Sequence, residues 1–113
     1  MKVHEFQTDP HMWKLAEQGV KTCECGIGDR AQRVRPGDTL QLRVGMANGE
    51  VMVLERRVGM VRLYERLAQA KGDFDVTSAG FYMWEELEAT LRKSYGYRVD
   101  REPFTVMYLG AMP

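Results

Sequence analysis

The chain has 113 residues, of which 44% are hydrophobic and 28% charged, and its 16 basic residues equal its 16 acidic residues in number. This size and composition predict one soluble globular domain over residues 1–113, with enough apolar side chains to bury a core. The charge balance argues against a strongly basic nucleic-acid protein while allowing a local basic patch, and no apolar run is long enough to span a membrane.

The first half of the chain predicts three strands and one helix. Asp9 followed by Pro10 is typical of a helix start, because the carboxylate caps the first turn and proline has no N–H to lose there. We therefore expect a helix over residues 10–18, ended by Gly19. Polar and apolar residues alternate in the strand manner over residues 2–6, 21–27 and 39–44.

The second half predicts a hairpin, two helices and a closing strand. Asn48-Gly49 is a strong hairpin signal, and it leads into a long strand over 51–64 that we expect to be bulged or kinked at Gly59. The remaining expected elements are a short helix over 63–70, a longer helix over 82–95 and a strand over 103–110. Short hairpins without regular βα alternation favour an α+β fold, a small mixed-sheet β-barrel with flanking helices.

The predicted strand 21–27 contains the chain's two cysteines. It places Cys23 and Cys25 on one face, which we expect to be buried, with both thiols reduced. The spacing of cysteine and histidine matches neither a zinc site nor a redox Cys-x-x-Cys, so we expect no metal and no other cofactor. No signal peptide is visible, and reduced cysteines suit a cytoplasmic protein.

Glu24 lies on the opposite face of this predicted strand, and Lys21 stands at its start. Spacing alone favours a solvent-facing glutamate paired with Lys21 or Arg30, since surface ion pairs are common and weak. The other interpretation is a functional lysine–glutamate pair in a cleft. The two differ in whether the side chains converge within hydrogen-bond reach in a concave pocket.

The residues HEF…DP…W…GVKTCE…DR…PGD resemble the ASCH family of the PUA-like superfamily. They are similar to its small-protein branch, typically written HEL…P..F..I..G.KTFE.R..DR.F..GD. In the second half, AGFYMWEELEATLRKSYG is similar to the family's Gly-Phe, helix and Tyr-Gly pattern, and PFTVMYLG resembles its closing strand. The resemblance covers nearly the whole chain and implies a PUA-like β-barrel with a cleft between the barrel and its flanking helices.

The resemblance also implies that Gly19, Lys21, Thr22 and Glu24 line this cleft. Relatives are taken to bind RNA or modified nucleobases, and some remove the acyl group of N4-acetylcytidine with a lysine, a threonine and a later glutamate. Lys21 matches that lysine. Glu24 replaces the threonine, and Ala79 stands where the later glutamate is expected.

Arginine is concentrated in the middle of the chain. Between residues 28 and 62 there are seven arginines and four acidic residues, and the planar guanidinium suits phosphate contacts and base stacking. We expect Arg30, Arg33 and Arg35 to contact phosphate and Tyr64 to face the cleft. An ordinary mixed-charge surface is the alternative. The branch pattern also usually has an arginine where Gly26 stands.

Three functions remain open at the level of sequence. The first is a module that binds RNA or a modified nucleoside, with Lys21, Thr22 and Glu24 reading a base edge. The second is a small hydrolase acting on a modified nucleoside or RNA, with Lys21 and Glu24 as an acid/base pair. The third is an accessory protein of a phage or mobile element whose partner is another protein.

Overall fold

The computed structural model describes residues 1–110, and every strand and both longer helices expected from the sequence are present with small shifts of their ends. The short helix expected over 63–70 is reduced to a 3₁₀ helix over Leu67–Ala70, because residues 63 and 64 still belong to the preceding strand. In chain order the elements are β1 (Val3–Gln7), α1 (Pro10–Glu17), β2 (Cys23–Ile27), α2 (Asp29–Gln32), β3 (Thr39–Gly45), β4 (Val51–Tyr64), α3 (Trp84–Tyr95) and β5 (Phe104–Leu109). Short 3₁₀ helices span Leu67–Ala70, Val76–Ala79 and Gly96–Asp100. The one-turn helix α2 and the last two 3₁₀ helices were not predicted.

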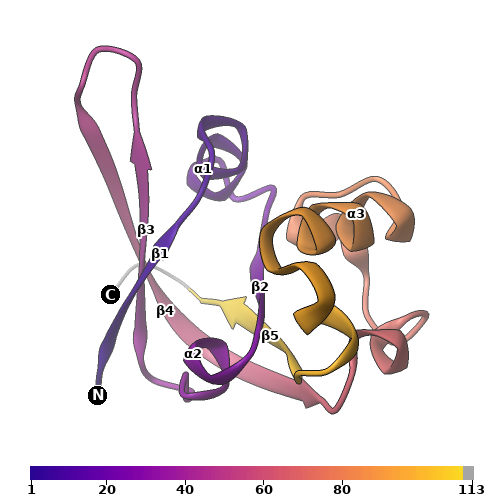
Figure 1. Cartoon of the computed structure of the whole chain (residues 1–113). Coiled ribbons are helices and arrows are strands. Elements are labelled where there is room, and N and C mark those ends of the chain that lie inside the picture. Colours follow the sequence, from indigo (N-terminus) through magenta and orange to yellow (C-terminus); the bar gives the residue numbers. More distant parts are fainter. Residues whose placement is uncertain (111–113) are drawn as a thin grey trace.

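The five strands form one mixed sheet in the order β1-β3-β4-β5-β2 (Figure 1). The β1–β3 pair is parallel, and the other neighbouring pairs are antiparallel. The long strand β4 pairs first with β3 and then with β5, and the register shifts between Val58 and Met60, which confirms the bulge predicted at Gly59. The sheet curls into a half-barrel whose two edges are β1 and β2, so the expected α+β barrel with flanking helices is confirmed.

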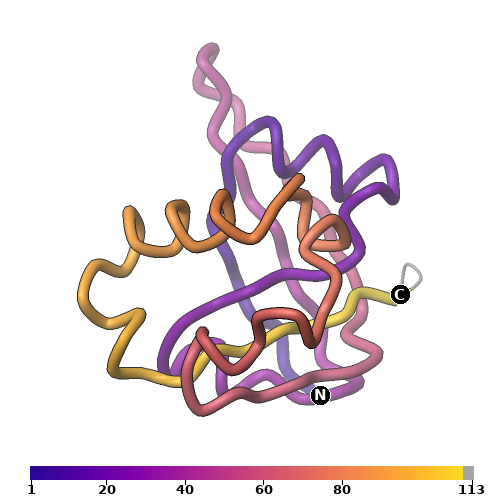
Figure 2. The backbone as a smooth tube through the Cα atoms, turned by 90° about the vertical axis from the view of Figure 1, so that its right-hand side faces the viewer, coloured from indigo at the N-terminus to yellow at the C-terminus, as the bar shows by residue number. Residues whose placement is uncertain are grey.

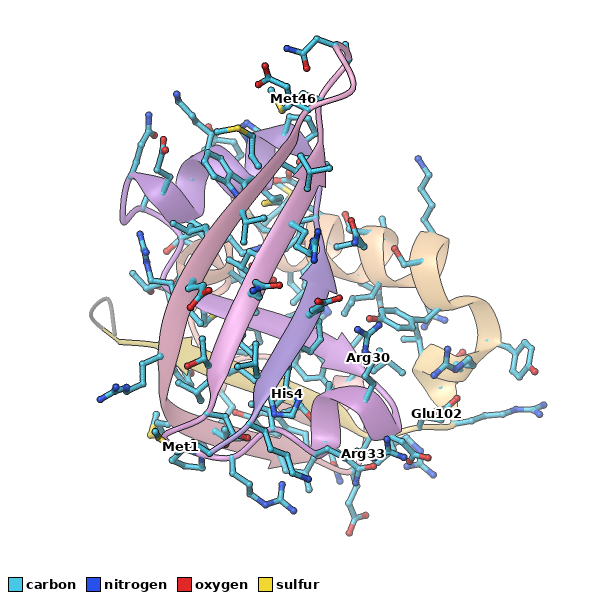
Figure 3. The ribbon with its side chains drawn as sticks, turned by 90° about the vertical axis from the view of Figure 1, so that its left-hand side faces the viewer. Met1, His4, Arg30, Arg33, Met46 and Glu102 are labelled. Atoms are coloured by element: carbon cyan, nitrogen blue, oxygen red, sulfur yellow. The ribbon has the colours of Figure 1, made fainter. Side chains whose placement is uncertain are left out.

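Local signals account for the ends of two elements. The Asp9 carboxylate accepts a hydrogen bond from the Met12 N–H at 2.8 Å and caps α1. The β3–β4 hairpin turns at Asn48-Gly49, where Gly49 has a φ of +88° that favours glycine. This hairpin projects beyond the rest of the molecule, with Met46 near its tip (Figures 1 and 3).

Two clusters of buried side chains form the core, and β5 contributes to both of them through its two faces. The first includes Cys23, Ile27, Leu87, Leu91, Phe104 and Val106. The second includes Trp13, Ala16, Leu40, Leu42, Val58 and Met107. Because successive strand residues point to opposite faces, Val106 belongs to the first cluster and its neighbour Met107 to the second. Helix α3 runs beside β2 (Figure 2), so this edge strand has little contact with solvent.

A buried carboxylate fastens the start of the chain to the entry of β3. Asp38 accepts hydrogen bonds from the backbone N–H groups of Lys2 and Arg35 at 3.1 and 3.0 Å, and its Oδ2 lies 2.8 Å from His4 Nε2. The contact with His4, supported by the two backbone bonds, lowers the pKa of Asp38 from 3.8 to about 2. Within residues 1–110, no helix combines the length and apolar character needed to cross a membrane.

Candidate functional site

A pocket of about 390 Å³ opens at the seam between the two edges of the half-barrel. Its walls come from the β1–α1 connection, from β2 with the residue two before it, and from α3 with the loop that leads into it. The polar lining residues include Gln7, Thr8, Lys21, Glu24, Thr90 and Ser94, and the apolar ones include Met12, Phe81, Leu87 and Leu91. This volume and mixed lining are typical of small-molecule sites.

Lys21 and Glu24 converge in this pocket. Lys21 Nζ lies 2.9 Å from Glu24 Oε1, and the two side chains are only 6% and 12% exposed. The backbone N–H of Lys21 donates to the Leu15 carbonyl at 3.0 Å, which holds the lysine against the end of α1. Glu24 is the second residue of β2 and pairs with the buried Met107 of β5. The interpretation of Glu24 as a solvent-facing glutamate is therefore wrong, because both faces of β2 are covered.

The hydrogen-bonding capacity of this pair is largely unused. Glu24 Oε1 is buried, and no residue within 1–110 donates a hydrogen bond of good geometry to it, so its short contact with Lys21 is an ion pair at a poor angle. The Lys21 ammonium has three N–H donors, and in the described part of the chain Glu24 is the group that pairs with it. Since buried polar groups normally have partners, the pair is suited to contact a bound molecule.

The neighbouring polar side chains differ in what they can offer a ligand. Asp9 also lines the pocket, but its carboxylate already caps α1. Thr8, Thr90 and Ser94 contribute hydroxyl groups that can donate or accept. Ala79 lines the same pocket with a methyl group, so the position where the resemblance implies a late glutamate has no acid.

The two cysteines are free, as predicted, and differ in accessibility. Cys23 is fully buried and its Sγ lies 3.4 Å from Ser78 Oγ, whereas Cys25 is half-buried and lines the pocket. Interaction with the neighbouring Cys25 thiol lowers the pKa of Cys23, and interaction with Cys23, together with burial, raises the pKa of Cys25 well above its usual value. Residues 1–110 contain no group of three or more side chains arranged to hold a metal ion.

Three residues predicted for the cleft lie elsewhere, and the first of them, Gly19, is exposed and is not among the residues that line the pocket. Thr22 is exposed and is not among the residues that line the pocket; its backbone N–H donates to Ser78 and its carbonyl accepts from Leu109. Tyr64 is buried in the first core cluster, where its ring packs on Phe104 and its hydroxyl donates to Asp73 at 2.7 Å. Burial raises the pKa of Tyr64 to about 12, so its phenol stays protonated.

The predicted arginine cluster is divided between two hollows. Arg30 lines a hollow that adjoins the pocket. Arg33 and Arg35 line a different hollow, of about 330 Å³, with Lys2 and Asp38 near the start of the chain. The structure thus separates arginines that are close in sequence.

The pocket residues of α3 were missed from the sequence. Thr90 and Ser94 are four residues apart on α3 and therefore share a face of the helix. They flank the apolar stripe that contains the buried Leu87 and Leu91. This pair of polar residues, placed beside the apolar positions that face the core, could have indicated from the sequence that the helix forms one wall of the site.

No protein-family model matches this chain, and no curated protein matches it. Among solved structures, the chain is similar to the crystal structure of a hypothetical protein, PH0355, with a TM-score of 0.75. The match covers 96% of this chain and 97% of that chain at 18% sequence identity. At this identity the likeness shows the fold, a compact α+β domain, and carries no statement about activity.

Proposed function

We propose that this protein is a small nucleobase- or RNA-binding module of the ASCH, PUA-like type, and that its pocket takes one base between β2 and α3. The observation that carries the proposal is the buried Lys21–Glu24 pair, whose facing atoms lie 2.9 Å apart on the pocket wall. An ammonium donor beside a carboxylate acceptor matches the edge of a base that has a ring acceptor next to an exocyclic amine.

The rest of the pocket supports a planar ligand. Phe81, Leu87 and Leu91 supply apolar and aromatic surface for a base face. Thr90 and Ser94 supply hydroxyls that can complete the hydrogen bonds of its edge. Because the chain has no net charge, selective affinity comes from this pocket and not from neutralising a long run of phosphates. Single-stranded RNA, whose bases can be splayed out, therefore suits it better than a duplex.

The test is a calorimetric titration of the four ribonucleosides and of short single-stranded RNAs against wild type and Glu24→Gln. We expect wild type to prefer a base with an exocyclic amine and Glu24→Gln to lose roughly 1–3 kcal/mol of that preference. Glu55→Gln, which removes the same charge from an exposed position on β4, serves as the matched control. The proposal fails if no nucleoside or RNA binds at low salt, or if Glu24→Gln discriminates like wild type.

A hydrolase acting on a modified nucleoside or RNA is the second candidate, favoured by the short contact of Lys21 with Glu24 inside a pocket that also contains hydroxyl groups. A lysine and a carboxylate in contact can move a proton to and from a water molecule that attacks an acyl group. For N4-acetylcytidine we expect little or no hydrolysis, because Glu24 and Ala79 replace the threonine and the late glutamate. Turnover that is abolished in Lys21→Met would support the hydrolase instead.

A further inference from the structure

A second hollow, of about 400 Å³, continues from the pocket along the same seam. The two share the lining residues Gln7, Ser94 and Tyr95. Together they form one groove that runs from the Lys21–Glu24 pair, past the C-terminal end of α3, to α2. A ligand that places one end against Lys21 and Glu24 therefore has room to extend toward α2.

The second hollow has a different charge character from the first. Its lining residues are Phe6, Gln7, Ile27, Arg30, Ala31, Ser94, Tyr95 and Arg98. The two charged residues among them are both arginines, and no acidic side chain of residues 1–110 lines the hollow. Arg30 comes from α2 and Arg98 from the 3₁₀ helix after α3, so segments far apart in sequence bring two guanidinium groups to one place.

Both guanidinium groups are held in position by aromatic rings and hydrogen bonds. Arg30 lies over the ring of Phe6, 5.5 Å from its centroid, and donates to the carbonyl of Glu5. Arg98 lies over the ring of Tyr95 at 5.4 Å and donates from Nε and Nη2 to Glu102 at 2.6 and 3.3 Å. Figure 3 shows Arg30 beside the seam, and Arg33 on the other side of α2.

Both arginines still have N–H groups that can donate hydrogen bonds to a bound anion. A guanidinium has five N–H groups. Two of those on Arg98 are used by Glu102, and one on Arg30 is used by Glu5. The remaining N–H groups take no partner from side chains of the described residues that line the hollow. Because the rings and hydrogen bonds already hold both guanidinium groups, binding an anion there costs little side-chain entropy.

We propose that the ligand of this groove is a phosphorylated nucleoside, with its base against Lys21 and Glu24 and its phosphate bound by Arg30 and Arg98. This inference rests on the proposed function, and it adds the phosphate and the two residues that bind it. The same chemistry is presented by a free mononucleotide and by a nucleotide within RNA. Arg33 lines the separate hollow near the chain start and has no part in this contact.

The experiment compares calorimetric affinities of the four ribonucleosides with those of their 5′- and 3′-monophosphates and of trinucleotides, at two salt concentrations. For wild type we expect one monophosphate of the preferred base to bind about tenfold more tightly than its nucleoside, since hydrogen bonds to a charged group are strong. This advantage should shrink at the higher salt concentration. A trinucleotide that binds more tightly than the mononucleotide would identify RNA as the source of the phosphate.

The variants are Arg30→Gln and Arg98→Gln, with Arg33→Gln as the matched loss of one positive charge outside the groove. We expect the ratio of monophosphate to nucleoside affinity to fall toward one in the first two and to stay as in wild type in Arg33→Gln. Thermal melting of each variant reports whether it is folded. If nucleosides bind but the ratio of monophosphate to nucleoside affinity is near one in wild type, the phosphate site is wrong while the proposed function stands. The same holds if this ratio is unchanged in Arg30→Gln and Arg98→Gln. Absence of binding by every probe overturns the proposed function as well.

Discussion

Lys21 and Glu24 form an ion pair of 2.9 Å at the edge of the half-barrel, on side chains that are 6% and 12% exposed. The desolvation of such a pair offsets much of its mutual attraction, so its presence is weak evidence for a role in stability. Removing only one partner should nevertheless destabilise the fold, because it leaves the other charge buried and unpaired. The burial of the pair can therefore be tested without a ligand, from the free energy of unfolding of variants that lack one or both charges.

We expect Lys21→Met to lower the free energy of unfolding by about 3 kcal/mol, because the Glu24 carboxylate is then buried without a counter-charge. The double variant Lys21→Met/Glu24→Gln should recover most of this loss. The measurement is urea denaturation of the single and double variants.

The Lys14–Glu17 pair on α1 provides the matched control, since its atoms are 3.8 Å apart and its side chains are 63% and 43% exposed. Lys14→Met should change the free energy of unfolding by no more than about 0.5 kcal/mol. If Lys21→Met proves as mild as Lys14→Met, the pair is not buried as the structure has it.

The second prediction concerns acid stability. The pKa of Asp38 is lowered from 3.8 to about 2 in the folded chain, chiefly by the hydrogen bond with His4. A lowered folded-state pKa stabilises the fold at pH values above the unfolded-state pKa, and this stabilisation is lost as the pH falls from 3.8 toward about 2. The shift corresponds to about 2 kcal/mol at neutral pH.

Asp38→Asn should therefore be less stable than wild type at neutral pH, and the two should approach each other in stability as the pH is lowered through this window. Chemical denaturation at a series of pH values measures the difference. Glu50→Gln, on the exposed hairpin turn, is the control and should follow wild type throughout. A gap between wild type and Asp38→Asn that does not narrow on acidification contradicts the role of this carboxylate.

Local signals explain why most of the fold was predictable. The capping carboxylate of Asp9 and the hairpin turn at Asn48-Gly49 act within a few residues of themselves, so the sequence contains their cause. The one-turn helix α2 lacks such a signal, because its cap Gly28 has no side chain to accept a hydrogen bond. It is held instead by tertiary packing of Ala31, which no local pattern reports.

The sequence allowed us to predict which residues were candidates for the site, but not how they are arranged in space. Spacing placed Lys21 near Glu24, but the burial of both depends on how α1 and α3 pack against an edge strand. For the arginines, proximity in sequence was misleading, since the backbone N–H of Arg35 donates to Asp38, and Asp38 also accepts from Lys2 at the start of the chain. Arg98, far from the cluster in sequence, reaches the groove because the 3₁₀ helix after α3 brings its guanidinium next to Gly28, the residue that precedes α2.

The third prediction concerns the reactivity of the two cysteines, which depends both on the pKa of each thiol and on its exposure to solvent. The pKa of the Cys23 thiol is lowered by its interaction with the Cys25 thiol, yet its side chain is fully buried. Cys25 is more accessible, but its interaction with Cys23 and its burial raise its pKa. Because a thiol must be both ionised and accessible to react quickly, we expect neither to react rapidly in the native protein.

Ellman titration with and without denaturant tests this. Both thiols should react slowly in the native protein, with Cys25→Ser removing the faster of the two phases, and both should react quickly after unfolding. Two fast-reacting native thiols would show that the cysteine face of β2 is not packed against α3.

The last prediction concerns the contact between β2 and α2. A Cβ added at Gly26 would lie 2.7 Å from the Cβ of Ala31, and both residues are buried. One of the two elements must then shift, so we expect Gly26→Ala to lower the free energy of unfolding by about 1–3 kcal/mol. The same close packing excludes the arginine that the ASCH pattern usually has at this position. In Gly45→Ala, where no atom of residues 1–110 lies within 4 Å of the new Cβ, the free energy of unfolding should change by no more than about 0.5 kcal/mol.

The double variant Gly26→Ala/Ala31→Gly tests whether that contact is the cause. Moving the methyl group from α2 to β2 removes the close approach, so part of the lost stability should return, less about 1 kcal/mol for placing glycine in a helix. Because Arg30 precedes Ala31 on α2, a shift of this helix should also weaken monophosphate binding in Gly26→Ala more than in the double variant. Denaturation and calorimetric titration of the same three proteins decide the matter. Equal losses in the single and double variants would show that α2 does not pack against Gly26.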